Sequence, residues 1–263
     1  MYYKLKQMKL QLWRNATLLL NIDGSSILVD PMLGEKGSLG KFPMTDNELL
    51  NPLVDLPFKT EELIEKLDQI DAVVITHLHP DHWDVRAVEL IDKTTTILCP
   101  DIIADEIAQQ GFQNIVSIHE HIRWKNMDIS ITKGQHGTGE IGEKMGTVNG
   151  FVFKTDHQSV YIVGDSIWYD DIAKEIDRHQ PQHIIVAGGA ATFSVGEPII
   201  MTSEDILNVC KHAPKAKVWV THLEAVSHCK ENREFIQSAI NSKGYESQCF
   251  IPKDGEEVTL SFH

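Results

Sequence analysis

The chain has 263 residues, of which 24% are charged, and a formal net charge of −14. This length can bury a substantial core, and no linker-like composition divides it, so we expect a single domain over residues 1–263. The negative charge disfavours nucleic acid and anionic membranes as partners, and no cluster of Lys and Arg offsets it.

The N-terminal part begins with three strand-like runs, at residues 9–13, 16–22 and 25–30. The sequence DGSS at 23–26 predicts a hairpin turn between the last two runs. Residues 34–58 are rich in Gly, Pro and polar side chains and predict a long loop, which is often a functional feature. A helix is expected at 60–67, with Thr60 as its N-cap.

From residue 71 onward, strands and helices alternate, give way to a strand-rich stretch, and then alternate again. Strands are expected at 71–76, 95–99, 114–118, 121–124, 127–134, 147–155, 159–165, 183–187, 217–222, 248–251 and 257–262. Helices are expected at 85–91, 101–110, 170–178, 203–211 and 229–240. Hairpins combined with βα units predict an α/β (α+β mixed) fold with two mixed sheets and helices outside them.

The cysteines and the N-terminal sequence indicate the cellular compartment of the protein. Four widely spaced cysteines are present, Cys99, Cys210, Cys229 and Cys249. They form no CxxC pair and are typical of reduced thiols rather than of a disulfide framework. The basic and then apolar N-terminus is interrupted by Arg14, Asn15 and Asp23, and no apolar run reaches the roughly 20 residues that span a bilayer. We therefore expect a cytoplasmic protein without stable membrane insertion; a homo-oligomer is compatible with the sequence.

The segment HLHPDH directly follows the predicted strand at 71–76. It contains four potential metal ligands, His77, His79, Asp81 and His82. Imidazole and carboxylate groups bind zinc and similar divalent ions at neutral pH. A plain solvated turn is built from Gly, Pro, Asn or Asp and has no use for three imidazoles, so the segment predicts a metal site.

Three further donors stand in comparable places. His136, Asp165 and His222 each follow a predicted strand. Taken singly, each is more often a structural residue than a ligand. Together with the HLHPDH segment, they predict one shared metal site.

This series of motifs resembles the metallo-β-lactamase superfamily, and the early run SSILVDP is similar to the DP-containing opening of that family. Within it, the chain most resembles the branch that holds L-ascorbate-6-phosphate lactonase and the phospholipase D that cleaves N-acylphosphatidylethanolamine. The resemblance implies an αββα sandwich and a site for two divalent ions, with zinc expected first and manganese or iron as alternatives. It also implies the ligands: His77, His79 and His136 for one ion, Asp81, His82 and His222 for the other, and Asp165 as a bridge.

Such a site predicts a hydrolase. Two ions about 3.5 to 4 Å apart share a water molecule and lower its pKa, which supplies hydroxide at neutral pH. We expect this dinuclear-metal-bound hydroxide to cleave an ester, lactone or phosphodiester bond of a small molecule, with Asp81 also orienting the nucleophile or accepting its proton. Two alternatives remain: a thioesterase of the glyoxalase II kind, and a non-catalytic, metal-dependent sensor or binding module.

Weaker candidates follow two of the ligands. Glu224 and His228 come shortly after His222 and are candidates for lining the pocket, with His228 as a proton donor; a helix start with polar surface groups explains them equally well. Gly137 and Gly139 could let backbone amides approach an anionic substrate, although a flexible loop is the plainer interpretation.

Two other features are noted. His119 and His121 alternate along a predicted strand and are expected on an exposed face. Related sequences of the resembled branch often carry a Gly-His-Ala-Thr stretch where this chain has Arg14-Asn15-Ala16-Thr17, and this departure argues against transferring the lactonase substrate.

Overall fold

The computed structural model describes residues 8–260 of the chain. The strands are β1 (Met8–Arg14), β2 (Thr17–Ile22), β3 (Ser25–Val29), β4 (Ala72–Val74), β5 (Thr96–Pro100), β6 (Asn114–Ile118), β7 (His121–Trp124), β8 (Met127–Lys133), β9 (Asn149–Lys154), β10 (Ser159–Ile162), β11 (His183–Ala187), β12 (Lys217–Thr221), β13 (Cys249–Phe250) and β14 (Glu257–Leu260). The helices are α1 (Thr60–Leu67), α2 (Val85–Leu90), α3 (Asp101–Gln109), α4 (Gly139–Met145), α5 (Asp170–His179), α6 (Ser203–His212) and α7 (Arg233–Ser242). Residues 261–262 of the last predicted strand lie outside the described residues.

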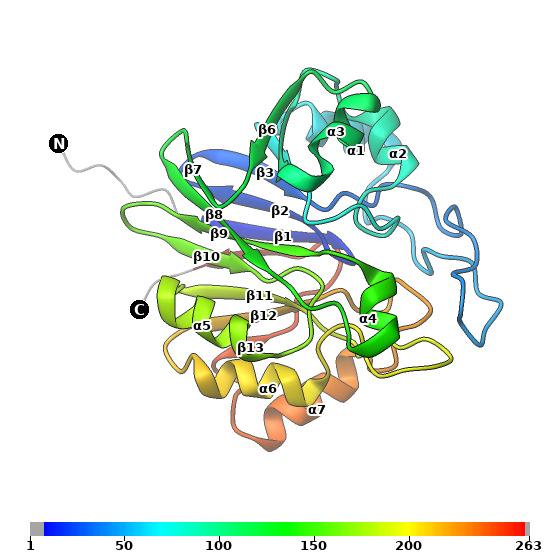
Figure 1. Ribbon diagram of the computed structural model, residues 1–263, viewed down its shortest axis with the longest axis vertical. Helices are drawn as coiled ribbons and strands as arrows, with labels where there is room; N and C mark the ends of the chain where they lie inside the picture. The colour runs from blue at the N-terminus through cyan, green and yellow to red at the C-terminus, as the bar shows by residue number, and fades with distance from the viewer. Residues whose placement is uncertain (1–7, 261–263) are drawn as a thin grey trace.

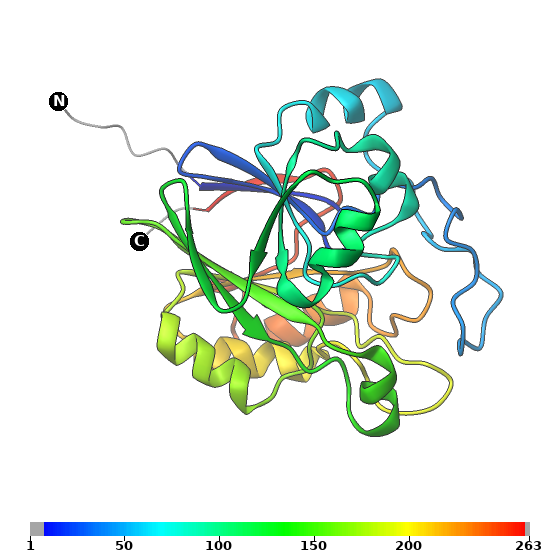
Figure 2. The same ribbon diagram turned by 45° about the horizontal axis from the view of Figure 1, so that its top comes forward.

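The strands form two seven-stranded mixed sheets, ordered β14-β1-β2-β3-β4-β5-β6 and β13-β12-β11-β10-β9-β8-β7. Helices α1–α3 cover the outer face of the first sheet and α5–α7 cover that of the second (Figures 1 and 2). The αββα sandwich expected from the sequence is confirmed.

Connection length decides which strands run parallel. Strands β1, β2 and β3 are joined by tight turns and pair antiparallel, and Asp23 and Gly24 take the positive φ values (47° and 80°) that such a hairpin turn requires. The pairs β3–β4, β4–β5 and β5–β6 are parallel because longer connections return the chain to the same end of the sheet. The second sheet repeats this scheme, since β7–β10 are antiparallel and β10–β13 are parallel.

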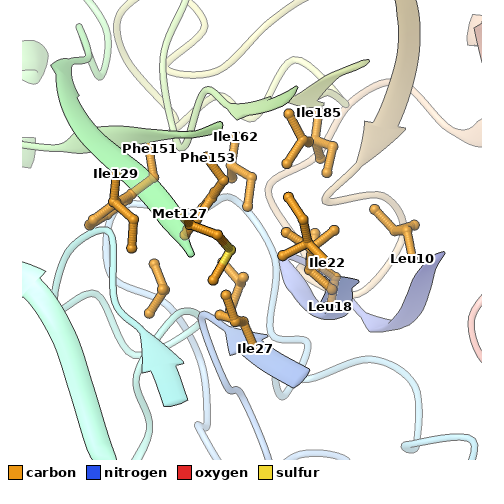
Figure 3. Close-up of a cluster of buried hydrophobic side chains, with 14 of the residues drawn as sticks. Leu10, Leu18, Ile22, Ile27, Met127, Ile129, Phe151, Phe153, Ile162 and Ile185 are labelled. Atoms are coloured by element: carbon orange, nitrogen blue, oxygen red, sulfur yellow. The ribbon is translucent and has the colours of Figure 1, made fainter. Parts of the chain in front are cut away.

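The main core lies between the two sheets. Leu18, Ile22 and Ile27 of the first sheet pack there with Phe151 and Ile185 of the second, as Figure 3 shows, and all are at most 1% exposed. Two further clusters fill the space between each sheet and its helices. Because the strands are covered on both faces, β9, β10 and β11 are buried along nearly their whole length.

This topology gathers the ends of several strands. β8 and β10 both pair antiparallel with β9, and β10 and β12 both pair parallel with β11. The strands β8, β10 and β12 therefore run in the same direction. Their carboxyl ends therefore lie at one edge of the second sheet. The parallel strands β3 and β4 end together in the first sheet. His77, His136, Asp165 and His222 of the predicted site follow β4, β8, β10 and β12, and Asp30 follows β3.

Three local predictions were wrong. Residues 139–145 form helix α4 rather than a loop. Thr60 is the first residue of α1, whose N-cap is Lys59 without a side-chain hydrogen bond. Helix α7 begins at Arg233 rather than at residue 229, because the Asn232 side chain accepts a hydrogen bond from the Phe235 N–H and caps the helix there.

Among the described residues, no helix combines the length and apolarity needed to cross a membrane.

Candidate metal centre

The HLHPDH segment forms a tight turn between β4 and α2. The carbonyl of His79 accepts hydrogen bonds from the backbone N–H groups of His82 and Trp83, each at 2.9 Å. Asp84 then caps α2 by accepting a hydrogen bond from the Ala87 N–H at 2.7 Å. A turn this short holds its donor side chains within reach of one centre.

The seven predicted donors converge in three overlapping groups, and within each group the donor atoms lie within 4.8 Å of one another. The groups are His77/His79/His136, His77/His82/Asp165 and Asp81/His82/His222. The first and last groups coincide with the two ligand sets implied by the sequence resemblance. We call His77, His79 and His136 the first trio, and Asp81, His82 and His222 the second trio.

Asp165 lies between the two trios. Its Oδ2 is 3.1 Å from Nε2 of His82 and 3.5 Å from Nε2 of His222 in the second trio. The same oxygen is 3.7 Å from Nε2 of His136 in the first trio. This position fits the bridging role predicted for Asp165.

Four of the imidazoles have a second partner that fixes their rings. Nδ1 of His77 lies 2.9 Å from Thr76 Oγ1, Nδ1 of His82 lies 2.8 Å from Asp30 Oδ2, and Nδ1 of His136 lies 2.8 Å from the Ile199 carbonyl. Nδ1 of His222 lies 3.8 Å from Cys229 Sγ. When Nδ1 donates outward, Nε2 keeps its lone pair for a ligand at the centre, which is how metal-binding histidines are held.

The first trio is electrically neutral. Burial lowers the pKa of His77 well below its ordinary value, and the neighbouring imidazole of His82 adds to the effect. Burial likewise lowers the pKa of His79 and of His136. Neutral imidazoles with free lone pairs are the form that binds a metal ion.

Three carboxylates, those of Asp30, Asp81 and Asp165, lie against the imidazoles of the second trio. Burial opposes the charged form of His82, but the carboxylates of Asp165, Asp30 and Asp81 outweigh it and raise the pKa to about 10. Burial also opposes ionisation of Asp81 and Asp165, yet the neighbouring imidazole of His82 holds the pKa of both carboxyls below the ordinary value. The carboxylates thus draw positive charge into a buried site.

The residues present fit a pair of divalent ions. No Lys or Arg in residues 8–260 forms an ion pair with Asp30, Asp81 or Asp165, all at most 6% exposed. Oδ1 of Asp165 is buried without a hydrogen-bond partner in the same part of the chain. Buried carboxylates need paired charge, and without Lys or Arg that charge comes either from protonated imidazoles or from metal ions that would take the place of their protons. A mixed imidazole and carboxylate set suits zinc, manganese or iron.

The donors open into a cavity of about 260 Å³. Its lining consists of Phe42, Pro43, Met44, His79, Pro80, Asp81, His136, Met145, Asp165, Phe193, Ile199 and His228. The walls are apolar, and the lining contains no Lys or Arg. A larger groove of about 720 Å³ elsewhere is lined by side chains of both charges and contains none of the donors.

Two loops meet over this cavity. Met44 belongs to the long loop predicted at 34–58, and its carbonyl accepts hydrogen bonds from both the N–H and the hydroxyl of Ser194, each at 2.8 Å. The buried guanidinium of Arg14 donates to the carbonyls of Met32 and Gly34 at 2.6 and 2.9 Å, and to Val54 at 3.0 Å. These bonds hold the loop in place as a wall of the cavity.

His228 lies in the cavity between two aromatic rings. Phe193 stacks on the imidazole with ring centroids 5.3 Å apart and an interplanar angle of 6°, and Phe42 meets it edge-on at 5.4 Å. Burial lowers the pKa of His228 to about 4. His228 is therefore a neutral, 5%-exposed polar group in an otherwise apolar wall.

The other predicted contacts lie outside this lining. The Glu224 carboxylate accepts hydrogen bonds from the backbone N–H and the guanidinium of Arg233. A side chain at Gly137 would meet Ile199 Cγ2 at 2.8 Å, so glycine there permits close packing under the wall. Gly139 is the first residue of α4. Substrate contact by Glu224, Gly137 and Gly139 stays a prediction.

Several residues that the structure brings to the site are not among the residues predicted from the sequence. Asp30 and Thr76 support the ligands, and Phe42 and Phe193 hold His228. Asp30 follows strand β3 in the DP-containing run, which is the one signal that could have marked it. The two phenylalanines carry no sequence signal, since only the folded loops bring them together.

This chain is similar in sequence to a known protein family and to several bacterial proteins. Residues 26–223 match a family model described as the beta-lactamase superfamily domain. The UPF0173 protein YddR of Bacillus subtilis (strain 168) is 39% identical over 251 residues, which cover 94% of this chain and 98% of that protein. A UPF0173 metal-dependent hydrolase of Staphylococcus carnosus (strain TM300) is 23% identical over 261 residues, covering 95% of this chain and 99% of that protein.

Two solved structures are also similar over nearly the whole chain. The isothiocyanate hydrolase from Delia radicum gut bacteria is 35% identical with a TM-score of 0.90, and the match covers 96% of this chain and 99% of that one. A possible metal-dependent hydrolase from Veillonella parvula DSM 2008 is 31% identical with a TM-score of 0.91, covering 97% and 100% of the two chains.

Proposed function

This chain belongs to the beta-lactamase superfamily and is a metal-dependent hydrolase, and on that premise we propose that it adds water to an electrophilic carbon of a small, uncharged molecule. We further propose that two divalent ions, one at each trio and both touching Asp165, are its cofactors. The finer branch with L-ascorbate-6-phosphate lactonase and the N-acylphosphatidylethanolamine phospholipase D stays a prediction, because the relatives described above carry other names.

The observation that carries this proposal is the composition of the cavity wall. Apolar side chains surround the donors, and no Lys or Arg lines the cavity. An anionic phosphodiester bound there would lose its hydration without gaining a cationic partner from the wall, which is unfavourable. Of the three bonds expected from the sequence, the ester and the lactone therefore fit better than the phosphodiester.

A neutral heterocumulene fits the same wall and is the first candidate substrate. The relative named isothiocyanate hydrolase is 35% identical and shares the fold over 96% of this chain. Organic isothiocyanates are small, uncharged and apolar outside their reactive group. Their hydrolysis adds the oxygen of water to the central carbon and a proton to the nitrogen. The second proton of water stays on the sulfur of the resulting thiocarbamic acid, and when the C–N bond then breaks this proton moves to the nitrogen, which gives carbonyl sulfide and an amine.

When bound, the two ions would supply an acidified water and polarise the substrate, which is the chemistry of dinuclear hydrolytic sites. The chain supplies the rest. Asp81, whose Oδ2 lies 3.1 Å from His222 Nε2, is placed to orient the nucleophile. His228 faces the substrate as a neutral imidazole, so it serves as a hydrogen-bond donor to the substrate heteroatom rather than as a cationic acid. Phe42 and Phe193 fix the imidazole and exclude water.

The test is a substrate panel with protein reconstituted separately with Zn²⁺ and Mn²⁺. An aryl isothiocyanate and a neutral aryl ester should be turned over faster than an aryl phosphodiester, and His79→Ala and Asp165→Ala should abolish turnover. Faster cleavage of the phosphodiester, or unchanged activity in either variant, would contradict the proposal. His228→Phe, which keeps the aromatic stack, should reduce kcat more than it raises KM.

The same panel separates the alternatives. A glutathione thioester tests the thioesterase of the glyoxalase II kind, whose anionic substrate finds no cationic side chain in the cavity lining. Tight metal and ligand binding without turnover of any substrate would favour the non-catalytic sensor or binding module instead.

A further inference from the structure

Asn15 is a buried polar residue at the bend between β1 and β2, and it belongs neither to the seven candidate donors nor to the cavity lining. It is fully buried and has a φ of 56°. This left-handed conformation is unfavourable for most residues other than glycine, and Asn is among the few that tolerate it. Burial is costly for the polar side chain, and the left-handed conformation is unfavourable for the backbone. Specific contacts must therefore account for Asn15 at this position.

The contacts of Asn15 converge on the second trio. Its side-chain Nδ2 donates to the carbonyl of Asp81 at 3.2 Å and lies 3.4 Å from the Asp81 carboxylate. Its own carbonyl accepts a hydrogen bond from the His222 N–H at 2.9 Å. His222 also has a left-handed φ, 66°, so this hydrogen bond helps to hold a strained backbone. One residue thus contacts two donors that lie far apart in sequence.

The side-chain oxygen of Asn15 argues against a purely stabilising role for this residue. Oδ1 of Asn15 is buried without a hydrogen-bond partner among residues 8–260. A buried polar atom left unpaired costs about 1–3 kcal/mol, and a side chain kept only for stability would be replaced by one without this cost. Within the described part of the chain, the side-chain amide of Asn15 donates to Asp81 alone and makes no hydrogen bond to the first trio.

We propose that Asn15 is a positioning residue that sets Asp81 and His222 for the second ion, an inference that rests on the two-ion site proposed above. The amide orients the main chain and carboxylate of Asp81, and the left-handed backbone directs the Asn15 carbonyl to His222. The second ion, and not the first, depends on this residue.

Two variants separate the side chain from the backbone. Asn15→Gly removes the side-chain amide but keeps a residue that readily adopts a positive φ. Asn15→Ala removes the side-chain amide and adds backbone strain. Asp23→Gly is the matched control, because Asp23 also has a positive φ, 47°, but lies exposed in the β2–β3 turn. Zn²⁺ is titrated into each metal-free protein against a chromophoric chelator, and the two binding steps are fitted separately.

The expected result is a second Zn²⁺ step weakened roughly 10- to 100-fold in Asn15→Gly and Asn15→Ala, as for other residues that support metal ligands. The Zn²⁺ affinity of the first step in both Asn15 variants, and of both steps in Asp23→Gly, should stay within about twofold of the affinity in the unchanged protein. Two unchanged steps in Asn15→Gly, or equal weakening of both steps, would overturn the assignment. If the unchanged protein binds two ions but hydrolyses nothing, the proposed function fails while the role of Asn15 is still decided by the titration. A single Zn²⁺ in the unchanged protein would refute both.

Discussion

Replacing Asp30 with Asn should weaken metal binding at the second trio while leaving the fold intact. Asp30 is 2% exposed and accepts three hydrogen bonds, from the Thr76 N–H at 2.8 Å, the Thr76 hydroxyl at 2.7 Å and His82 Nδ1 at 2.8 Å. An amide offers one oxygen where the carboxylate offers two, so at least one of these donors would face an N–H group. The backbone should not change, because Asn tolerates the positive φ of 44° at this position.

The size of the effect follows from these contacts. A hydrogen bond to a charged group contributes about 1.5–3 kcal/mol, and about 1.4 kcal/mol corresponds to a tenfold change in affinity. Loss of the His82 bond should therefore weaken the second ion about 10- to 100-fold, in line with other supporting residues. An amide N–H facing Nδ1 would also shift the imidazole proton to Nε2, the atom that lies 3.1 Å from Asp165.

The assay is calorimetric titration of Zn²⁺ into the metal-free Asp30→Asn protein. Asp84→Asn is the control, since Asp84 is equally buried at 2% exposure. Its carboxylate caps α2 and accepts a hydrogen bond from the Gly34 N–H, and within residues 8–260 it bonds to none of the seven metal-ligand candidates. Wild-type affinity in Asp30→Asn, together with an unchanged melting temperature, would show that Asp30 does not hold His82 for a metal and that the reasoning is wrong.

Three further outcomes are expected. Burial lowers the pKa of His183 to about 4, so its neutral form contributes to stability above about pH 6.5 and this contribution is lost as the pH falls toward 4. At about 1.4 kcal/mol per pH unit the loss is about 3 kcal/mol. His183→Asn, which keeps an acceptor for the Trp219 N–H, should lose less stability between pH 6.5 and pH 4.5 than the unchanged protein does by urea unfolding, and an identical pH dependence would contradict this. Arg14→Met leaves the carbonyls of Met32, Gly34 and Val54 without their donor and should speed proteolysis within the loop at 34–58, as followed by mass spectrometry; equal cleavage rates would contradict it. Chelation should lower the melting temperature, because ions at about 100 times their Kd stabilise by about 2.7 kcal/mol each, and an unchanged melting curve would argue against bound ions.

The sequence determined much of the fold because its signals are local. The alternation of short apolar runs with helical segments predicted the two mixed sheets and nearly every strand. The candidate donors could also be picked out, since the HLHPDH segment and the residues His136, Asp165 and His222 each follow a predicted strand and imidazoles are rare in plain turns. Where a local signal was weak, as in the glycine-rich run that forms α4, the prediction was wrong.

Only the tertiary structure decided what surrounds the donors. Asn15 reaches Asp81 and His222, and Phe42 and Phe193 enclose His228, through contacts between segments far apart in the chain. Such contacts have no local pattern, because they depend on how two sheets and their loops pack against each other. The HLHPDH motif therefore marks a candidate metal centre from sequence alone, whereas the apolar wall without Lys or Arg, on which the proposed substrate class rests, appears only when the chain is folded.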